Sequence, residues 1–195
     1  SVVRRNPEKN VHKPYIQPKH MAKSDSFFIR AHVDTDGSNY APSEIDLGSF
    51  VNLGVSKSTL LRIHNVAISL ADPDDPGTQA WVGLDANAEV MVSMQLTTQS
   101  QTDIVHASDK SLVSSGKVYI ANTSATANNT TLISESFDVL PQMFKNGYLV
   151  GVDSLFWAAE SNIAISGNVR CSIVMECTLE AATQANSVAL ALSQQ

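Results

Sequence analysis

The chain has 195 residues, of which 43% are apolar and 16% charged, and its formal net charge is −6. This length fits one domain with an appendage, and the apolar fraction is sufficient for a buried core. The negative charge excludes bulk electrostatic attraction to nucleic acid. Because no run of about 18 apolar residues occurs, we expect no membrane-spanning helix. Charged residues are scarce against the roughly 25% of typical globular domains, which favours a surface covered by uncharged polar side chains or by other subunits.

Charge is divided unevenly along the chain. Residues 1–25 carry a net charge of +4, whereas residues 26–195 carry −10. Pro7, Pro14 and Pro18 interrupt the basic stretch, which has no apolar periodicity, so we predict an extended arm without a core of its own. Such an arm contacts either phosphates, non-specifically, or acidic neighbouring subunits. The candidate contact residues are its six cations, Arg4, Arg5, Lys9, Lys13, Lys19 and Lys23.

The remainder of the chain predicts about eight β-strands separated by turn signals. Residues 90, 92, 94 and 96 are all apolar, which indicates a strand with one buried face. In residues 60–70, Arg62 and His64 fall on the apolar line, so we expect a bulge or a polar contact there. Gly167-Asn168 predicts a tight hairpin turn. The segments that read as strands are 27–33, 60–70, 90–96, 113–121, 131–137, 148–157 and 163–179.

Helical patterns are confined to residues 141–145 and to the tail, where Ala185, Val188 and Leu192 form a weak apolar stripe. The alternation of strands and helices that marks a parallel α/β sheet is missing. We therefore predict an all-β antiparallel sandwich, specifically a single eight-stranded jelly roll with an extended N-terminal arm. The expected division is an arm over 1–25, a sandwich over 26–180, and a tail over 181–195 that is either helical or a second arm.

The two cysteines are predicted to lie in the core. Cys171 and Cys177 are six residues apart in one predicted strand, which places their α-carbons about 20 Å from each other and excludes a disulfide. They share strand parity with Ile173 and Met175, so we expect both thiols to behave as small core hydrophobes.

One turn cluster offers a calcium candidate. Asp34, Asp36 and Asn39 resemble the start of a calcium loop, in which alternate oxygen ligands surround a hard cation. The glycine is fourth rather than sixth in this loop, and position twelve is Ile45 rather than glutamate. An Asx-rich turn is the favoured alternative, and no cofactor or metal is predicted.

Nothing in the sequence predicts an enzyme. The nucleophile elbow, the paired-histidine zinc motif and the phosphate-binding loop are all missing from it. His32, His64 and His106 lie in separate strands or loops. An enzyme on a β-sandwich would require these histidines, or a pair of carboxylates, to converge in one pocket.

The chain resembles the single jelly-roll coat proteins of icosahedral viruses. The resemblance lies in the order of its parts: a basic extended arm, then about eight antiparallel strands with long loops, then a tail of small residues. The resemblance is architectural and covers the whole chain, without a diagnostic motif. It implies a structural subunit of a virion capsid that assembles with copies of itself, and with any other capsid proteins, while its arm tethers neighbours or contacts nucleic acid non-specifically. Residues 37–48, 71–80 and 122–130 become interface or outer loops. The arm is less basic than those of coat proteins that package RNA tightly, which favours tethering.

A binding module is the alternative function. A lectin-like or adhesin-like β-sandwich at a cell surface or outside the cell would use the loop of Asp34 and Asp36, or that of Asp72 and Asp74, to bind calcium and a ligand. Calcium-dependent stability and a monomer or trimer in solution would favour this alternative.

Overall fold

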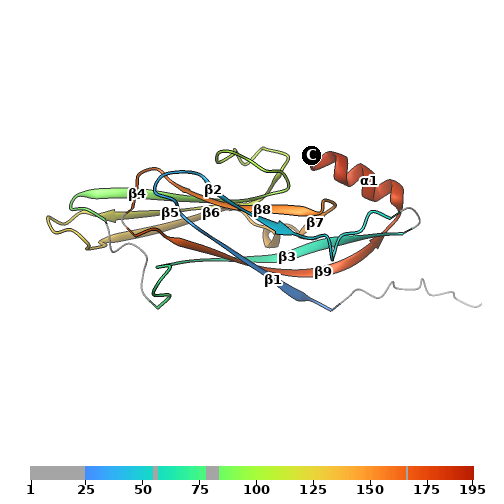
Figure 1. The fold of residues 1–195 in the computed structure, drawn as a ribbon, viewed down its shortest axis with the longest axis horizontal. Helices are drawn as coiled ribbons and strands as arrows, with labels where there is room; N and C mark the ends of the chain where they lie inside the picture. Colours follow the sequence, from blue (N-terminus) through green and yellow to red (C-terminus); the bar gives the residue numbers. More distant parts are fainter. Residues whose placement is uncertain (1–24, 55–56, 78–83, 166) are drawn as a thin grey trace, which may run out of the picture.

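The computed structural model describes residues 25–54, 57–77, 84–165 and 167–195 (Figure 1). Nine strands, one 3₁₀ turn and one helix make up this part of the chain. In order, they are β1 (Phe27–Asp34), β2 (Ala41–Asp46), β3 (Ser58–Ala71), β4 (Ala88–Thr97), β5 (Leu112–Asn122), β6 (Leu132–Val139), η1 (Pro141–Met143), β7 (Tyr148–Val150), β8 (Ser154–Ser161), β9 (Arg170–Ala182) and α1 (Gln184–Ser193).

The strands form two sheets that face each other as the layers of a sandwich (Figure 1). One sheet has four strands in the order β1-β9-β3-β7, and the other has five in the order β2-β8-β4-β5-β6. All strand pairs are antiparallel. The arm cations lie outside the described residues.

The pairing of the strands defines a jelly roll. Strand β1 pairs with β9, β2 with β8, β3 with β7, and β4 with β5, as in one long antiparallel ribbon folded at its middle. Wrapping this ribbon into a sandwich brings β9 beside β3 and β8 beside β4, which are the two remaining contacts of the eight strands. The predicted jelly roll is confirmed. The remaining strand, β6, is additional to these eight, lies at one edge of the five-stranded sheet and pairs only with β5.

Some predicted strand boundaries were wrong. Strand β2, which contains Pro42 and has Ile45 as its one buried residue, was missed. The segment 148–157 is two strands in different sheets, separated at Gly151. Gly167 and Asn168 do form a turn, with φ of 91° and 55°. However, β8 and β9 lie in different sheets, so this turn is a corner between the layers and the hairpin prediction was wrong.

The core follows the predicted alternation. Val90, Val92, Met94 and Leu96 are all buried on β4. Cys171 and Cys177 are free thiols, fully buried together with Ile173 and Met175 between them. Burial raises the pKa of each thiol to about 12, so both remain protonated and unreactive at neutral pH.

The predicted bulge lies at His64. The register of β3 against β9 shifts between Ile63 and Asn65, and the His64 ring lies 2.8 Å from the hydroxyl of Thr178. Beyond the bulge, the side-chain amide of Gln142 replaces a neighbouring strand, since it accepts from the backbone N–H of Val66 and donates to its carbonyl, at 3.0 and 2.9 Å. The edge of β3 is therefore closed at Val66 by a side chain.

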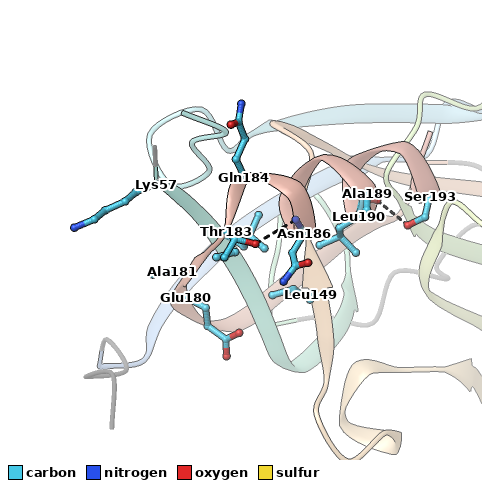
Figure 2. Close-up of a pocket in the computed structure, with 12 residues that line it drawn as sticks. Lys57, Leu149, Glu180, Ala181, Thr183, Gln184, Asn186, Ala189, Leu190 and Ser193 are labelled. Carbon is cyan, nitrogen blue, oxygen red and sulfur yellow. Dashed lines mark hydrogen bonds between the residues drawn. The ribbon is translucent and has the colours of Figure 1, made fainter. Parts of the chain in front are cut away.

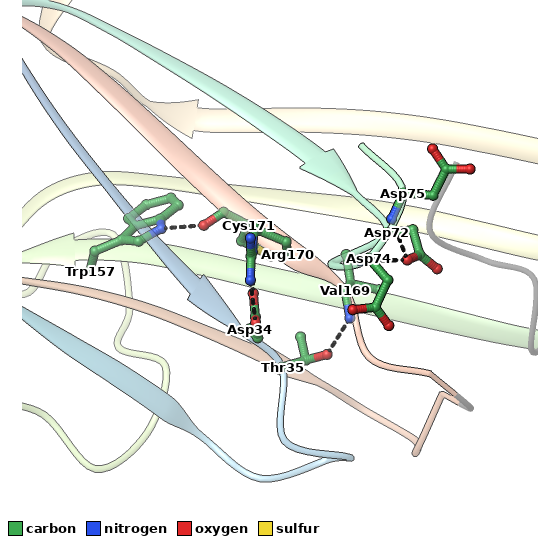
Figure 3. A network of polar contacts seen from close by, with 9 residues as sticks. All are labelled: Asp34, Thr35, Asp72, Asp74, Asp75, Trp157, Val169, Arg170 and Cys171. Carbon is green, nitrogen blue, oxygen red and sulfur yellow. Dashed lines mark hydrogen bonds and ion pairs between the residues drawn. The ribbon is translucent and has the colours of Figure 1, made fainter. Parts of the chain in front are cut away.

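A buried tryptophan joins the two layers. The indole N–H of Trp157, on β8, donates to the carbonyl oxygen of Cys171, on β9 of the other sheet, at 2.9 Å (Figure 3). The side chain of Trp157 is fully buried. We expect Trp157→Phe to lower the free energy of unfolding by about 2–3 kcal/mol, because it leaves a void and an unmade hydrogen bond.

Urea unfolding of the full chain measures this loss. Tyr119→Phe is the control, since the Tyr119 hydroxyl donates to Glu89 at the surface, and its removal should change stability by less than about 0.5 kcal/mol. Equal losses in the two variants would contradict a special role for the inter-sheet bond.

Candidate interaction surfaces

Helix α1 is attached to the sandwich by polar contacts. Thr183 caps its N-terminus, and the buried Ser187 hydroxyl donates to the hydroxyl of Ser58 at 2.7 Å. After the helix, the Gln194 side chain donates to the carbonyl of Leu149 and accepts from the backbone N–H of Gly151, at 2.6 and 2.8 Å. Because a network of this kind is directional, it fixes both the position and the rotation of the helix.

The rotation of α1 turns its larger apolar side chains toward solvent. The helical residues that are buried are Ser187 and Ala191, whereas Val188 is 43% exposed and Leu192 67% exposed. An amphipathic helix of an isolated domain ordinarily buries its apolar stripe. Here the stripe remains uncovered, as a surface that binds a partner would require. The described residues include no helix that is long and apolar enough to span a membrane.

An open groove of about 1030 Å³ runs beside α1 (Figure 2). Its apolar lining comes from three leucines on β3, β7 and α1, namely Leu60, Leu149 and Leu190, together with alanines of the helix and of the end of β9. The polar half of the lining consists of Lys57, Glu180, Thr183, Gln184, Asn186 and Ser193. We call the groove, together with the exposed Val188 and Leu192 of the same helix, the α1 surface.

A second uncovered region lies at the edge of the five-stranded sheet. Strand β6 pairs with β5 on one side only. Leu132 is 51% exposed and Ile133 36% exposed on this strand. Exposed apolar residues on an edge strand favour pairing with another chain unless something covers them.

The three predicted loops differ in structure. Half of 37–48 is strand β2, so the description of the whole range as a loop was wrong. Residues 72–77 form a turn in which the carboxylate of Asp72 accepts from the backbone N–H groups of Asp74 and Asp75, and residues 78–80 lie outside the described part. The range 122–130 begins with the last residue of β5 and continues as the β5–β6 loop, which the side chain of Asn122 closes by donating to the carbonyl of Thr126 at 2.8 Å.

The calcium candidates make protein contacts of their own. Asp34 forms an ion pair with Arg170, and the two hydrogen bonds, of 2.7 and 2.9 Å, hold the pKa of Asp34 below its usual range (Figure 3). Asp36 and Asn39 face each other across a tight turn at Gly37. Calcium binding at these residues was only the alternative to an Asx-rich turn, and it would require the ion pair of Asp34 to open. No three His, Cys, Asp or Glu side chains of the described residues gather as a metal site.

The structure does not bring the three histidines of the body together. His32, on β1, pairs in register with Ser172 of β9, whereas His64 contacts Thr178, six residues farther along the same strand. That separation corresponds to about 20 Å. His106 lies in the connection between β4 and β5, which belong to the other sheet.

Two carboxyl groups meet beside a buried glutamine. The fully buried side chain of Gln95 donates to the Tyr40 hydroxyl and to the backbone carbonyl of Asp103, at 2.8 and 3.0 Å. Next to this network, Oε2 of Glu160 is buried without a hydrogen-bond partner. Burial, and then the charge of the Asp103 carboxylate, raise the pKa of Glu160.

This pair makes stability depend on pH. Since the folded state raises the pKa of Glu160, it holds the proton more tightly than the unfolded chain, and stability falls as the pH rises above about 4.3, the ordinary pKa of glutamate. We expect Glu160→Gln to remove this loss, so that the variant gains stability relative to the original chain as the pH rises above about 4.3. Urea unfolding at several pH values measures the difference, and a constant difference would contradict the assignment.

Comparisons with known proteins concern the fold. No family model matches the chain, and no curated protein matches it in sequence. Among solved structures, VP1 of human polyomavirus 12, in complex with 3'-sialyllactosamine, is similar over 82% of this chain and 100% of its own, with 7% identity and a TM-score of 0.42. Apo VP1 of New Jersey polyomavirus is similar over the same shares, with 10% identity and a TM-score of 0.40. The Merkel cell polyomavirus virus-like particle is similar over 93% of this chain and 81% of its own, with 8% identity and a TM-score of 0.37.

The expected jelly-roll architecture is confirmed by the strand order and pairing of the two sheets. Sequence reasoning found the apolar stripe of the tail but not the direction in which it faces. That direction depends on the hydrogen bonds of Ser187 and Gln194, which connect the tail to strands more than 40 residues away.

Proposed function

We propose that this chain is a structural subunit that assembles with copies of itself into an icosahedral virus capsid, and that it resides in the virion. The observation that carries the proposal is the α1 surface. The jelly roll holds a helix by its small and polar face, so that Val188 and Leu192 lie on the outside beside an open groove. Copies of the same chain, packed side by side, would bury these side chains.

The composition supports contact between copies. A subunit in a shell touches several neighbours, and interfaces that form permanently are poorer in charge than a free surface. The chain has only 16% charged residues. Asn, Gln, Ser and Thr supply hydrogen bonds at such contacts without the desolvation cost of an unpaired charge.

The arm supports tethering. Arg4, Arg5, Lys9, Lys13, Lys19 and Lys23 give residues 1–25 a charge of +4, next to a body of charge −10. Attraction between the arm of one copy and the body of another follows from these charges and weakens with salt. Contact with nucleic acid through the arm is non-specific in this proposal. Its affinity should fall with salt as expected for the neutralisation of only a few phosphates.

Sedimentation velocity of the full chain, with increasing protein concentration, tests the proposal. We expect a step from subunits to one fast, narrow species, without stable intermediates, as for a closed particle. A monomer or trimer at all concentrations, made more stable by calcium, would contradict the proposal and favour a binding module.

A further inference from the structure

The two sheets of the sandwich are unequal at one end. In the first half of β3, residues Leu61–Ile63 pair with β7, and this pairing does not extend beyond Ile63. Beyond the bulge the four-stranded sheet consists of β1, β9 and β3 only, while the facing sheet extends outward to β6. Strand β6 therefore faces a place where the opposite sheet has no strand.

A slot of about 260 Å³ occupies this place, and we call it the β3–β6 seam. It is lined by Ile68, Ser69 and Leu70 of β3, by Val118 of β5, and by Ile133, Glu135 and Phe137 of β6. Ile68, Leu70 and Phe137 pack against the core from one side but are only partly buried. The seam is an apolar slot that opens at the side of the sandwich.

The backbone of β3 is open along the seam. Gln142 binds the N–H and the carbonyl of Val66, which point to the edge of β3 away from β9. In an antiparallel ladder, the residues two and four positions farther on direct their own N–H and carbonyl groups to the same edge. These residues are Ile68 and Leu70. In the described part of the chain, no backbone hydrogen bond is formed from this edge beyond Val66. The edge of β3 beyond Val66 is therefore open to pairing with a further strand.

The charges around the seam are negative. Glu135 lies opposite Val118, which is buried, so its carboxylate is on the core-facing side of β6 between Ile133 and Phe137. Among the described residues, Glu135 forms no ion pair. Asp72, Asp74 and Asp75 follow the end of β3. Arg170, the cation in register with Ala71, already pairs with Asp34.

We infer that the β3–β6 seam receives the N-terminal segment of a second copy, which adds to β3 as an extended strand. Residues 1–6 contain no proline, and in an extended strand Val3 and Arg5, or Val2 and Arg4, would lie on one face. This alternation of an apolar and a cationic side chain complements Ile133 and Glu135 on the facing strand. Main-chain hydrogen bonds supply affinity in such strand addition, and the side-chain pockets supply register.

The inference rests on the proposed function, because it names the place where the arm tethers a neighbour. Charge reversal at Glu135 tests it in the full chain. We expect Glu135→Lys to raise the protein concentration required for assembly by about 10-fold or more, since it places the new lysine beside an arginine of the arm. Combination with Arg4→Glu and Arg5→Glu should restore assembly to within about 3-fold of the original chain. Asp138→Lys is the matched control, with the same charge change on the outer face of the same strand, and it should have little effect.

Hydrogen exchange gives a second measurement on the original chain. The backbone amides of Ile68 and Leu70 should exchange at least about 10-fold more slowly in particles than in dilute subunits, and Glu135→Lys should remove this protection. Slow exchange already in dilute subunits would show that the chain's own arm occupies the seam and would overturn the inference. Equal effects of Glu135→Lys and Asp138→Lys, or failed rescue, would also overturn it.

The two proposals fail differently. Particles that form normally while the seam amides stay unprotected contradict this inference and leave the proposed function standing. A full chain that forms no particles contradicts the proposed function, and the inference falls with it. If Glu135 only guards the edge of the sheet, Glu135→Gln will cause aggregation without slower exchange at Ile68 and Leu70, which also overturns the inference.

Discussion

Leu192→Asp is expected to prevent assembly of the full chain while the subunit remains folded. Leu192 is 67% exposed, so the stability of the isolated subunit should change by less than about 0.5 kcal/mol. In a contact between copies, the substitution removes the burial of a leucine and places an unpaired carboxylate in its position. We expect the concentration required for assembly to rise by about 100-fold or more.

Light scattering against concentration measures this shift, and urea unfolding shows that the subunit is intact. Asn129→Asp is the control of equal charge, because it lies in the exposed β5–β6 loop, at the end of the sandwich opposite α1 (Figure 1). Assembly of Leu192→Asp at the original concentration would show that the α1 surface is not a contact between copies.

Gly147→Ala is expected to cause the largest loss of stability. Gly147 has a φ of 63°, and a β-carbon added there would lie 2.2 Å from the carbonyl oxygen of Ile63. That oxygen belongs to the backbone of β3, where β7 pairs with it, so relief of the clash requires that the strands move apart. We expect a loss of about 3 kcal/mol or more in the free energy of unfolding.

Gly37→Ala separates the two causes of this loss. Gly37 has a similar φ, of 58°, but a β-carbon there would meet no atom within 4 Å. Its substitution should therefore cost only the backbone term, about 1 kcal/mol. Urea unfolding of both variants gives the comparison. Equal losses would contradict a close approach of Gly147 to β3.

The sequence predicted those features that depend on neighbouring residues. The apolar positions of β4 and the shared parity of Cys171 and Cys177 follow from the two-residue repeat of a strand. The bulge of β3 was predictable because Arg62 and His64 interrupt an apolar line. The missed strand β2 contains a proline and polar residues, a composition that edge strands tolerate but that gives little signal.

Features that depend on the choice of sheet were not predictable. The turn predicted at Gly167-Asn168 does form, but it connects strands of different sheets rather than two strands of a hairpin. In the same way, the stripe of Val188 and Leu192 predicts a helix without saying which face is covered. The β3–β6 seam exists because β7, in one sheet, is too short to face β6, in the other sheet. The periodicity of the sequence does not show how strands of different sheets are placed relative to each other.

Assembly of the full chain is the central claim, and its arm is the tether. The most direct test is the mass of the native assembly, by light scattering with negative-stain imaging, for the full chain and for a chain that begins at Met21. We predict large closed particles of uniform size for the full chain and dissociation into small species when residues 1–20 are removed. A small discrete oligomer that is indifferent to this truncation would contradict the account.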